Sequence, residues 1–271
     1  MRVLVTGGCG FIGIHLVREL VARGMDVRVL DAVSAHTVLA QPGVSFSQHT
    51  VTNYDACLRA MRGVHLVYHL AARDDWSPAV QHPARLFSTN TRGTVEVLTA
   101  ARATGVQKVI LASSWEVYGN VIPSAEELPC NPITPVGASK LAAEIAGRLY
   151  TQIGLDVVIL RLFEVWGDGG RSAVEAFMAG RREIEGDGTQ TRDFVHVDDV
   201  VAALCTAYHW DPGTYNLGSG VETAILGLYR LLRTDEPVFV PPRQNLIMRS
   251  CADMERVGDL WQPKHMLEGM T

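Results

Sequence analysis

The chain has 271 residues, of which 47% are hydrophobic and 20% are charged. This composition indicates a globular protein that is long enough to bury a sizeable core. The formal net charge of −5 argues against an extended cationic surface, so we expect no nucleic-acid partner and no polybasic membrane anchor.

Short runs of β-branched and other apolar residues alternate with helical segments in the first part of the chain. Six runs are candidate strands: RVLVT (residues 2–6), VRVL (27–30), VSFS (44–47), LVYHL (66–70), KVILAS (108–113) and VVILRL (157–162). Strands that alternate with helices predict an α/β fold of the Rossmann type, with a doubly wound parallel sheet.

Three helical segments accompany these strands. Residues 11–24 place apolar side chains on one face at helical spacing and end at Gly24. The other two segments are residues 93–105 and 137–150, and the latter carries an apolar side chain every four residues beside small alanines. This face predicts a packed helical interface, such as that of a homodimer.

The regular alternation loosens after Leu162, and the later stretches hold more glycine, proline and arginine. We expect a main Rossmann domain formed by residues 1–163 and 197–219. The remaining pieces, residues 164–196 and 220–271, are expected to form one small discontinuous substrate-binding lobe beside it.

The five cysteines are scattered and show no CxxC spacing, which predicts reduced thiols and no metal site. The chain begins MRVLVTGG, without the regions of a signal peptide, and holds no apolar run of membrane-spanning length. We therefore expect a cytoplasmic protein.

The sequence VTGGCGFIG follows the first candidate strand and opens the first helix. Gly7, Gly10 and Gly13 recur every three residues, and Phe11 and Ile12 lie between the last two. Glycine permits the tight turn and lets a pyrophosphate approach bare backbone at the helix N-terminus. The pattern predicts a dinucleotide-binding turn.

The second candidate strand ends at Asp31, eighteen residues past Gly13. A carboxylate at this place accepts hydrogen bonds from both ribose hydroxyls and repels a 2′-phosphate, which favours NAD over NADP. The alternative is an aspartate that only forms a turn at the end of a strand.

A series of motifs runs through nearly the whole chain: TGGCGFIG, LVYHLAA, NTRGTVEVLTAAR, SSWEVYG, GASKLAAE, GDGTQTRDFVHVDDVV and YNLGSG. In this order they resemble the extended short-chain dehydrogenase/reductase family, and within it the sugar-nucleotide epimerases and dehydratases. The resemblance implies an enzyme whose bound NAD takes a hydride from a sugar carbon and returns it after a keto intermediate. The implied substrate is a nucleotide-diphosphate sugar, carried by UDP or dTDP.

The resemblance also implies roles for single residues around the cofactor. Leu70, Ala71 and Ala72 would line the cofactor channel, and Asn90 would support the central helix beside it. Lys140 would hold the nicotinamide ribose, although a lysine on a helix is also commonly a solvated surface residue.

The motif SSWEVYG carries three residues that the resemblance places at the substrate. Ser114 would hydrogen-bond the hydroxyl that is oxidised, or it only ends its strand. Glu116 matches the glutamate of the family's dehydratases and decarboxylases, and in a closed apolar cleft its pKa can rise enough for proton transfer. Trp115 replaces the neighbouring aspartate of the 4,6-dehydratases, which argues against that reaction.

Two arginines match positions that clamp the nucleotide diphosphate in this family. They are Arg192 and Arg249, and a guanidinium fork suits a pair of phosphate oxygens. The adjacent Asp198 and Asp199 resemble acid/base machinery in isolation, but we interpret them as caps of the helix that follows.

The family's active-site tyrosine lies four residues before the lysine, and this chain has Val136 there. Residues four apart share a helix face, so the phenol and the lysine of the family point together at the nicotinamide. Valine neither gives nor takes a proton. Glu164 also replaces a substrate-contacting asparagine, so the pocket that holds Val136 and Glu164 is expected to be reshaped.

Three explanations account for Val136. In the first, another group has taken over the proton transfer, with Glu116, Glu164 or a water as candidates. In the second, the protein binds NAD and a nucleotide sugar without redox chemistry. In the third, the valine is an engineered inactivating change. We favour the first, because Ser114, Glu116, Lys140 and Arg192 are all present.

Overall fold

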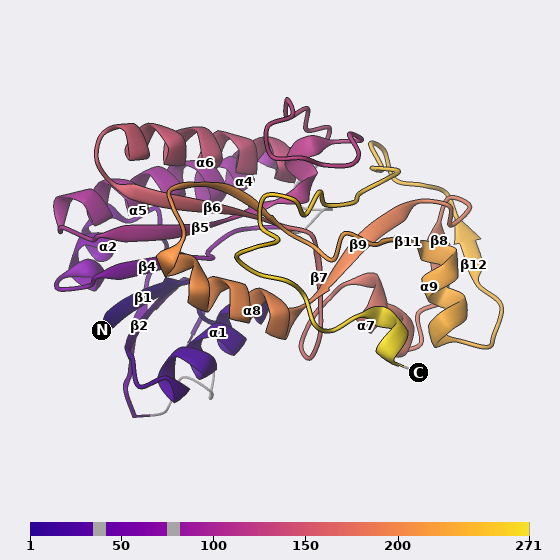
Figure 1. Ribbon diagram of the computed structural model, residues 1–271, viewed down its shortest axis with the longest axis horizontal. Helices are drawn as coiled ribbons and strands as arrows, with labels where there is room; N and C mark the ends of the chain where they lie inside the picture. Colours follow the sequence, from indigo (N-terminus) through magenta and orange to yellow (C-terminus); the bar gives the residue numbers. More distant parts are fainter. Residues whose placement is uncertain (35–41, 75–81, 271) are drawn as a thin grey trace.

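A seven-stranded parallel sheet forms the centre of the computed structural model, which describes residues 1–34, 42–74 and 82–270 (Figure 1). The strands lie in the order β10-β6-β5-β4-β1-β2-β3. Their bounds are β1 (Arg2–Thr6), β2 (Asp26–Asp31), β3 (Val44–Gln48), β4 (Leu66–His69), β5 (Lys108–Ser114), β6 (Asp156–Leu162) and β10 (Gly213–Leu217). All six predicted strands lie in this sheet, which confirms the predicted fold class.

Helices cover both faces of the sheet, as Figure 1 shows, with α2, α5 and α6 on one face and α1 and α8 on the other. The helical elements beside the sheet are α1 (Phe11–Ala22), α2 (Tyr54–Met61), α4 (Pro83–Phe87), η2 (Ser88–Arg92), α5 (Gly93–Ala103), η3 (Trp115–Tyr118), α6 (Pro135–Gln152), α8 (Val197–Thr206) and η4 (Ala207–His209). Among the described residues, no helix combines the length and the apolar character that crossing a bilayer requires.

Two hydrophobic cores fill the spaces between the sheet and its helices. One contains the buried face of α1, including Leu16 and Leu20, and the apolar side of α8. The other contains Val97 and Leu98 of α5 together with residues of α2 and the opposite face of the sheet. Strands that are buried on both faces read as continuous apolar runs, which is why the sequence marks them clearly.

The strand order reverses beside β1, where β2 and β4 flank the first strand on opposite sides. In open parallel sheets, a crevice opens at such a switch point, beyond the carboxyl ends of the strands. The glycine-rich turn between β1 and α1 lies at this place, so the topology itself positions a ligand site there.

A smaller group of elements lies at one end of the sheet, on the right in Figure 1. It consists of β7 (Glu164–Trp166), α7 (Ala173–Met178), β8 (Glu183–Glu185), β9 (Thr191–His196), β11 (Glu222–Ala224), α9 (Ile225–Leu232), β12 (Val238–Val240) and η5 (Leu267–Met270). These elements share a core that includes Phe177, Phe194 and Leu228.

The C-terminal stretch does not stay within this smaller group, although the sequence assigned residues 220–271 to the small lobe. Val257 and Trp261 are buried in the core on the α1 and α8 side of the large sheet. The stretch therefore returns from the lobe to the main domain, because its apolar side chains cover the face of the sheet beside α8.

Candidate active site

A cavity of about 640 Å³ lies between the carboxyl ends of the central strands and the smaller group of elements. Most of the residues that the sequence predicts for the site line it. These are Gly7, Gly10, Phe11, Ile12, Gly13, Leu70, Ala72, Ser114, Trp115, Glu116, Val136, Lys140, Glu164 and Arg192. Asp31, Ala71, Asn90 and Arg249 are not among the lining residues.

The glycine-rich turn has no room for side chains at two of its glycines. Gly7 adopts a positive φ of 73°, and a Cβ there would lie 2.6 Å from the backbone nitrogen of Ala71. A Cβ on Gly13 would collide with the carbonyl oxygen of Gly7. Gly10 is the N-cap of α1 and has no side chain to cap the helix. Gly10 and the first residues of α1 line the cavity, and a helix N-terminus with uncapped N–H groups fits the pyrophosphate of a dinucleotide.

Asp31 stands at the end of β2 beside this turn, as predicted. Its Oδ2 accepts a hydrogen bond from the backbone N–H of Cys9 at 2.9 Å, and its Oδ1 accepts one from Val33 at 3.1 Å. The carboxylate therefore fixes the turn against β2. Its contact with a ribose stays a prediction.

Asn90 supports the loop that carries Leu70 to Ala72, rather than the cavity itself. This buried side chain accepts a hydrogen bond from the N–H of Arg73 at 2.7 Å and donates to the carbonyl of Arg73 at 2.8 Å. It also donates to Oγ of Ser139 on α6 at 2.9 Å. Asn90 thus joins the end of β4 to the helix that carries Lys140.

Lys140 and Val136 lie one turn apart on α6 and both line the cavity. The Lys140 Nζ donates to the carbonyl oxygen of Ala112 at 2.8 Å, and burial lowers the pKa of this lysine to about 8. Val136 is buried and packs against Leu86. The helix begins here because Thr134 caps it and Pro135 occupies its first position.

Glu116 reaches the cavity from η3, the short turn after β5. Its backbone N–H donates to Oγ of Ser114 at 3.2 Å, and its Oε2 accepts a hydrogen bond from the Thr134 hydroxyl. Burial raises the pKa of the Glu116 carboxyl. Gly137 lets the first turn of α6 approach, since a Cβ there would collide with the carbonyl oxygen of Glu116. A carboxyl group therefore lies at the start of α6, in the cavity that Val136 also lines.

A second partly buried carboxyl, that of Glu164, lies in the same cavity with Arg192. Burial raises the pKa of Glu164, and the charge of Arg192 opposes this effect. Arg192 donates through Nη1 to the carbonyl oxygen of Ile247 at 2.9 Å, and its guanidinium carbon lies 4.9 Å from the ring centroid of Trp115. Trp115 thus supports the guanidinium at the cavity wall.

Arg249 does not reach the cavity, in contrast to its predicted role. Its side chain is 57% exposed and forms two 2.7 Å hydrogen bonds with the carboxylate of Glu222. Arg243 lines the cavity instead, 3.2 Å from Glu185. The sequence reasoning missed Arg243 because it lies in an irregular stretch after β12, without a motif to mark it.

Asp198 and Asp199 occupy the first turn of α8, but neither is its N-cap. His196 is the N-cap, and its Nδ1 accepts the N–H of Asp198 at 3.3 Å. Asp199 is buried and accepts hydrogen bonds through Oδ2 from the backbone N–H groups of Lys264 and His265 at 3.0 and 2.8 Å. The interpretation of this pair as caps is therefore wrong in detail, because Asp199 holds the C-terminal segment.

Comparisons with known proteins agree with this geometry. The chain is 36% identical to a UDP-glucose 4-epimerase of Mycolicibacterium smegmatis, with 100% of this chain and 96% of the relative aligned. Among solved structures, it is similar to a UDP-glucose 4-epimerase of Thermotoga maritima with UDP-glucose, at a TM-score of 0.92 and 31% identity, covering 99% of this chain and 95% of the other. A dTDP-glucose 4,6-dehydratase of Streptomyces venezuelae with bound NAD gives a TM-score of 0.91 at 27% identity, covering 99% and 95% of the two chains.

The glycine-rich turn, nearly all of the large sheet and most of the residues that line the cavity lie within one matched region. Residues 3–218 match the model of the family described as NAD dependent epimerase/dehydratase. This stretch spans β1 to β10 and contains every predicted cofactor residue. The predicted resemblance is confirmed: the chain belongs to the NAD dependent epimerase/dehydratase family.

Proposed function

We propose that this protein modifies a nucleotide-diphosphate sugar through a keto intermediate, by epimerisation, dehydration or a related reaction, with Glu116 in the proton-transfer role. The single observation that carries the proposal is the partly buried Glu116 carboxyl, whose pKa is raised by burial and which lines the same cavity as Val136 and Lys140. The sugar nucleotides named for the similar proteins carry UDP or dTDP, and we propose one of these carriers here.

NAD, when bound at the glycine-rich turn, supplies reversible hydride transfer. The chain's own residues then have separate tasks. Ser114, at the end of β5, hydrogen-bonds the reacting hydroxyl, and the Glu116 carboxylate accepts its proton while the carbon is oxidised. Return of this proton regenerates a hydroxyl group at the end of the reaction. Lys140 holds the cofactor's ribose and supplies a positive charge beside the carboxylate.

The raised pKa of Glu116 suits both directions of this proton transfer. A carboxyl with a pKa closer to neutrality accepts a proton more readily than an ordinary carboxylate and still releases it. The hydrogen bond from Thr134 orients Oε2 at the start of α6. Arg192 and Arg243 are proposed to bind the diphosphate, because both guanidinium groups line the cavity.

The burial of Val136 favours one further candidate function. A valine that packs against Leu86 is compatible with a protein that binds NAD and a nucleotide sugar without a redox step. In that case Glu116 would have no proton to move, and a bound sugar would leave unchanged.

One experiment separates these two functions. Purified protein is first analysed for bound NAD and then mixed with a panel of UDP-, dTDP- and GDP-sugars while the absorbance of reduced nicotinamide is followed. The proposal predicts a transient or trapped NADH signal together with an altered sugar. A sugar that binds and is recovered unchanged, without NADH, would support the binding function instead.

We also propose a homodimer through α5 and α6, which lie side by side on one face of the sheet (Figure 1). Val95, Ile145 and Leu149 on these helices are large apolar side chains with exposed fractions of 37%, 58% and 52%. A paired copy of the chain would remove this surface from water. Light scattering of the wild type and of Ile145→Glu tests it, since the dimer is predicted to dissociate in the variant.

A further inference from the structure

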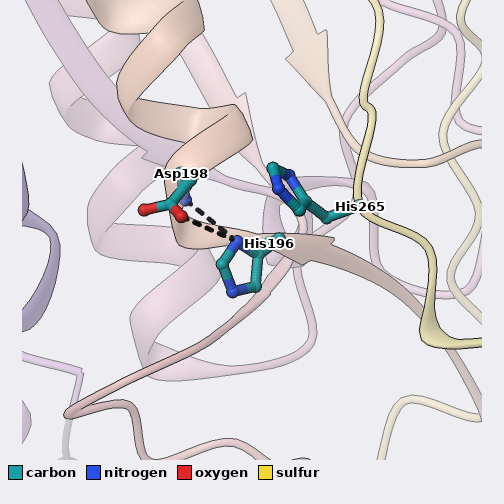
Figure 2. Close-up of side chains that lie close together, drawn as sticks. All are labelled: His196, Asp198 and His265. Carbon is teal, nitrogen blue, oxygen red and sulfur yellow. Dashed lines mark hydrogen bonds and ion pairs between the residues drawn. The ribbon is translucent and has the colours of Figure 1, made fainter. Parts of the chain in front are cut away.

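Two histidines and one aspartate from two separate parts of the chain meet where β9 runs into α8, away from the cavity-lining residues. His196 ends β9, Asp198 lies in the first turn of α8, and His265 comes from the C-terminal segment. Figure 2 shows these three side chains together at the start of the helix. Each offers one possible ligand atom, and these atoms all lie within 4.8 Å of one another.

The hydrogen bonds around the two histidines fix which ring nitrogens carry hydrogen. His265 Nδ1 lies 3.0 Å from Oδ1 of Asp199, and a carboxylate oxygen accepts, so Nδ1 donates and, in the neutral ring, Nε2 keeps its lone pair. His196 Nδ1 accepts the backbone N–H of Asp198, so its lone pair lies at this nitrogen. Each neutral ring therefore has one unprotonated nitrogen, which is the form that binds a metal ion. A metal ion at His196 Nδ1 would replace the 3.3 Å hydrogen bond from the Asp198 N–H.

The Nδ1 of His196, which carries the lone pair, lies near a carboxylate oxygen, which is also a hydrogen-bond acceptor. This Nδ1 lies 3.6 Å from Oδ2 of Asp198. His15 has a similar arrangement on the other side: its Nε2 donates to the carbonyl oxygen of Asp168 at 2.8 Å, and its Nδ1 lies 3.9 Å from Oδ1 of Asp198. In the neutral rings, two imidazole lone pairs thus lie near the Asp198 carboxylate oxygens, an arrangement that a cation stabilises.

We propose that His196, Asp198 and His265 bind one divalent transition-metal ion, for which Zn²⁺ is the specific candidate. Two imidazoles and one carboxylate suit Zn²⁺, Co²⁺ or Ni²⁺ better than Mg²⁺ or Ca²⁺, which prefer all-oxygen ligands. Zinc–nitrogen bonds of about 2.0–2.1 Å need ligand atoms somewhat closer than those of the structure. Rotation of the partly exposed His265 and Asp198 side chains supplies this movement, since their exposed fractions are 51% and 59%.

Asp199 is not one of the three proposed ligands, but it supports His265. Its buried carboxylate holds His265 through Nδ1–H, an arrangement that commonly orients metal-binding histidines. The N-terminus of α8 disfavours a cation through the helix dipole. The two negative charges of Asp198 and Asp199 oppose this effect and balance the charge of a dication.

The proposed ion joins parts of the chain that are distant in sequence. It would link the C-terminal segment at His265 to the β9–α8 junction, next to the loop whose Asp168 contacts His15 on α1. Bound metal is therefore predicted to stabilise the folded protein, because the unfolded chain holds no such set of ligands. No pattern in the sequence indicates the site, because His265 lies in no motif.

Zinc titration of the full-length, tag-free, chelator-treated protein tests the proposal, with a chromophoric chelator as the competing ligand. We expect one equivalent of zinc and a rise in Tm. Asp198→Asn and His265→Gln are each expected to weaken binding by about tenfold or more and to remove the rise in Tm. The control His209→Gln changes an exposed histidine on η4 and is expected to bind like the wild type.

Thermal melts without zinc show whether each variant folds. If His265→Gln does not fold, the zinc affinity of Asp198→Asn alone tests the proposal, because Asp198 is mostly exposed and its replacement should not disturb folding. Replacement of zinc by Co²⁺ adds an optical measurement, because imidazole and carboxylate ligation gives visible absorption without a thiolate charge-transfer band. Absence of zinc binding by the wild type would overturn the proposal. Unchanged affinity in Asp198→Asn, or a thiolate band in the cobalt spectrum, would also overturn it.

Discussion

The Thr134 hydroxyl donates a hydrogen bond to Oε2 of Glu116, at the point where α6 packs against the turn after β5. The same Thr134 oxygen accepts the backbone N–H of Gly137 at 3.0 Å and so caps α6. The start of the helix that carries Val136 and Lys140 is thereby joined to the carboxyl group proposed to move the proton. Five predictions follow from this arrangement and its surroundings.

Glu116→Gln is expected to lower kcat by roughly a hundred- to ten-thousand-fold, the range for loss of a positioned acid/base. Glutamine keeps the size of the side chain and an oxygen that accepts from Thr134, so the fold and the NAD content should not change. Steady-state kinetics with the converted sugar nucleotide measure the effect. Glu127→Gln, at an exposed position, is the matched control, and equal kcat values in the two variants would refute the role of Glu116.

Val136→Tyr is expected to make Glu116 less important, because a phenol at this position shares a helix face with Lys140. In the Val136→Tyr background, Glu116→Gln should then cost less in kcat than it does in the wild type. The double-mutant cycle measures this coupling. Val136→Phe adds a ring without a hydroxyl. If Glu116→Gln also costs less in kcat in the Val136→Phe background, the effect comes from the ring and not from proton transfer.

The pH dependence of kcat/KM should be bell-shaped. The rate falls at acid pH as Glu116 becomes protonated, and this limb lies above the usual range of a carboxyl because burial raises the Glu116 pKa. It falls at alkaline pH as Lys140 loses its proton, near the lysine pKa of about 8. Glu116→Gln is predicted to lose the acid limb and keep the alkaline limb, and persistence of both limbs would assign the acid one to another group.

Gly137→Ala should destabilise the protein and reduce its activity. A Cβ at Gly137 would collide with the carbonyl oxygen of Glu116 and lie 3.0 Å from Cβ of Pro132, so the start of α6 must move. Overpacking of this kind costs about 1–3 kcal/mol in the free energy of unfolding. In the control Gly227→Ala on α9, the new Cβ lies 3.9 Å from its nearest neighbour, and chemical denaturation should show no loss of stability there.

Glu144→Gln should be among the more destabilising single changes in α6. The buried Glu144 carboxylate accepts from Nε and Nη2 of Arg161 at 3.0 and 2.8 Å and from Oγ of Ser113 at 2.5 Å. Loss of its charge leaves the buried guanidinium uncompensated, at a cost of about 3–5 kcal/mol. Denaturant unfolding measures the effect, and a cost below that of Glu19→Gln, in the exposed pair with Arg23, would contradict it.

The strands of the large sheet can be predicted from the sequence because buried parallel strands have a recognisable residue pattern. Strands such as β5 and β6 have both faces covered by helices, so their apolar runs are continuous and visible. The glycine turn was equally visible, since Gly7 and Gly13 occupy places where a Cβ has no room. These features depend on local residue types and spacing, which a single sequence contains.

The rest of the site depends on where irregular segments pack. The motif around Arg249 predicts a contact with the diphosphate, but the structure pairs this residue with Glu222 on β11. Arg243 lines the cavity from a stretch without periodic pattern, and Asp199 finds its partners in the distant C-terminal segment. Such contacts are set by tertiary packing, so neither spacing nor propensity along the chain reveals them.

The most direct test of the central claim is rapid mixing of the NAD-loaded protein with the sugar nucleotide that it converts, in the wild type and in Glu116→Gln. The absorbance of reduced nicotinamide is followed within the first turnover. The account predicts equal sugar affinity in both proteins and an NADH signal that forms roughly a hundred- to ten-thousand-fold more slowly in the variant. NADH that forms equally fast in both proteins would contradict it, because the proton would then leave the sugar without the Glu116 carboxylate.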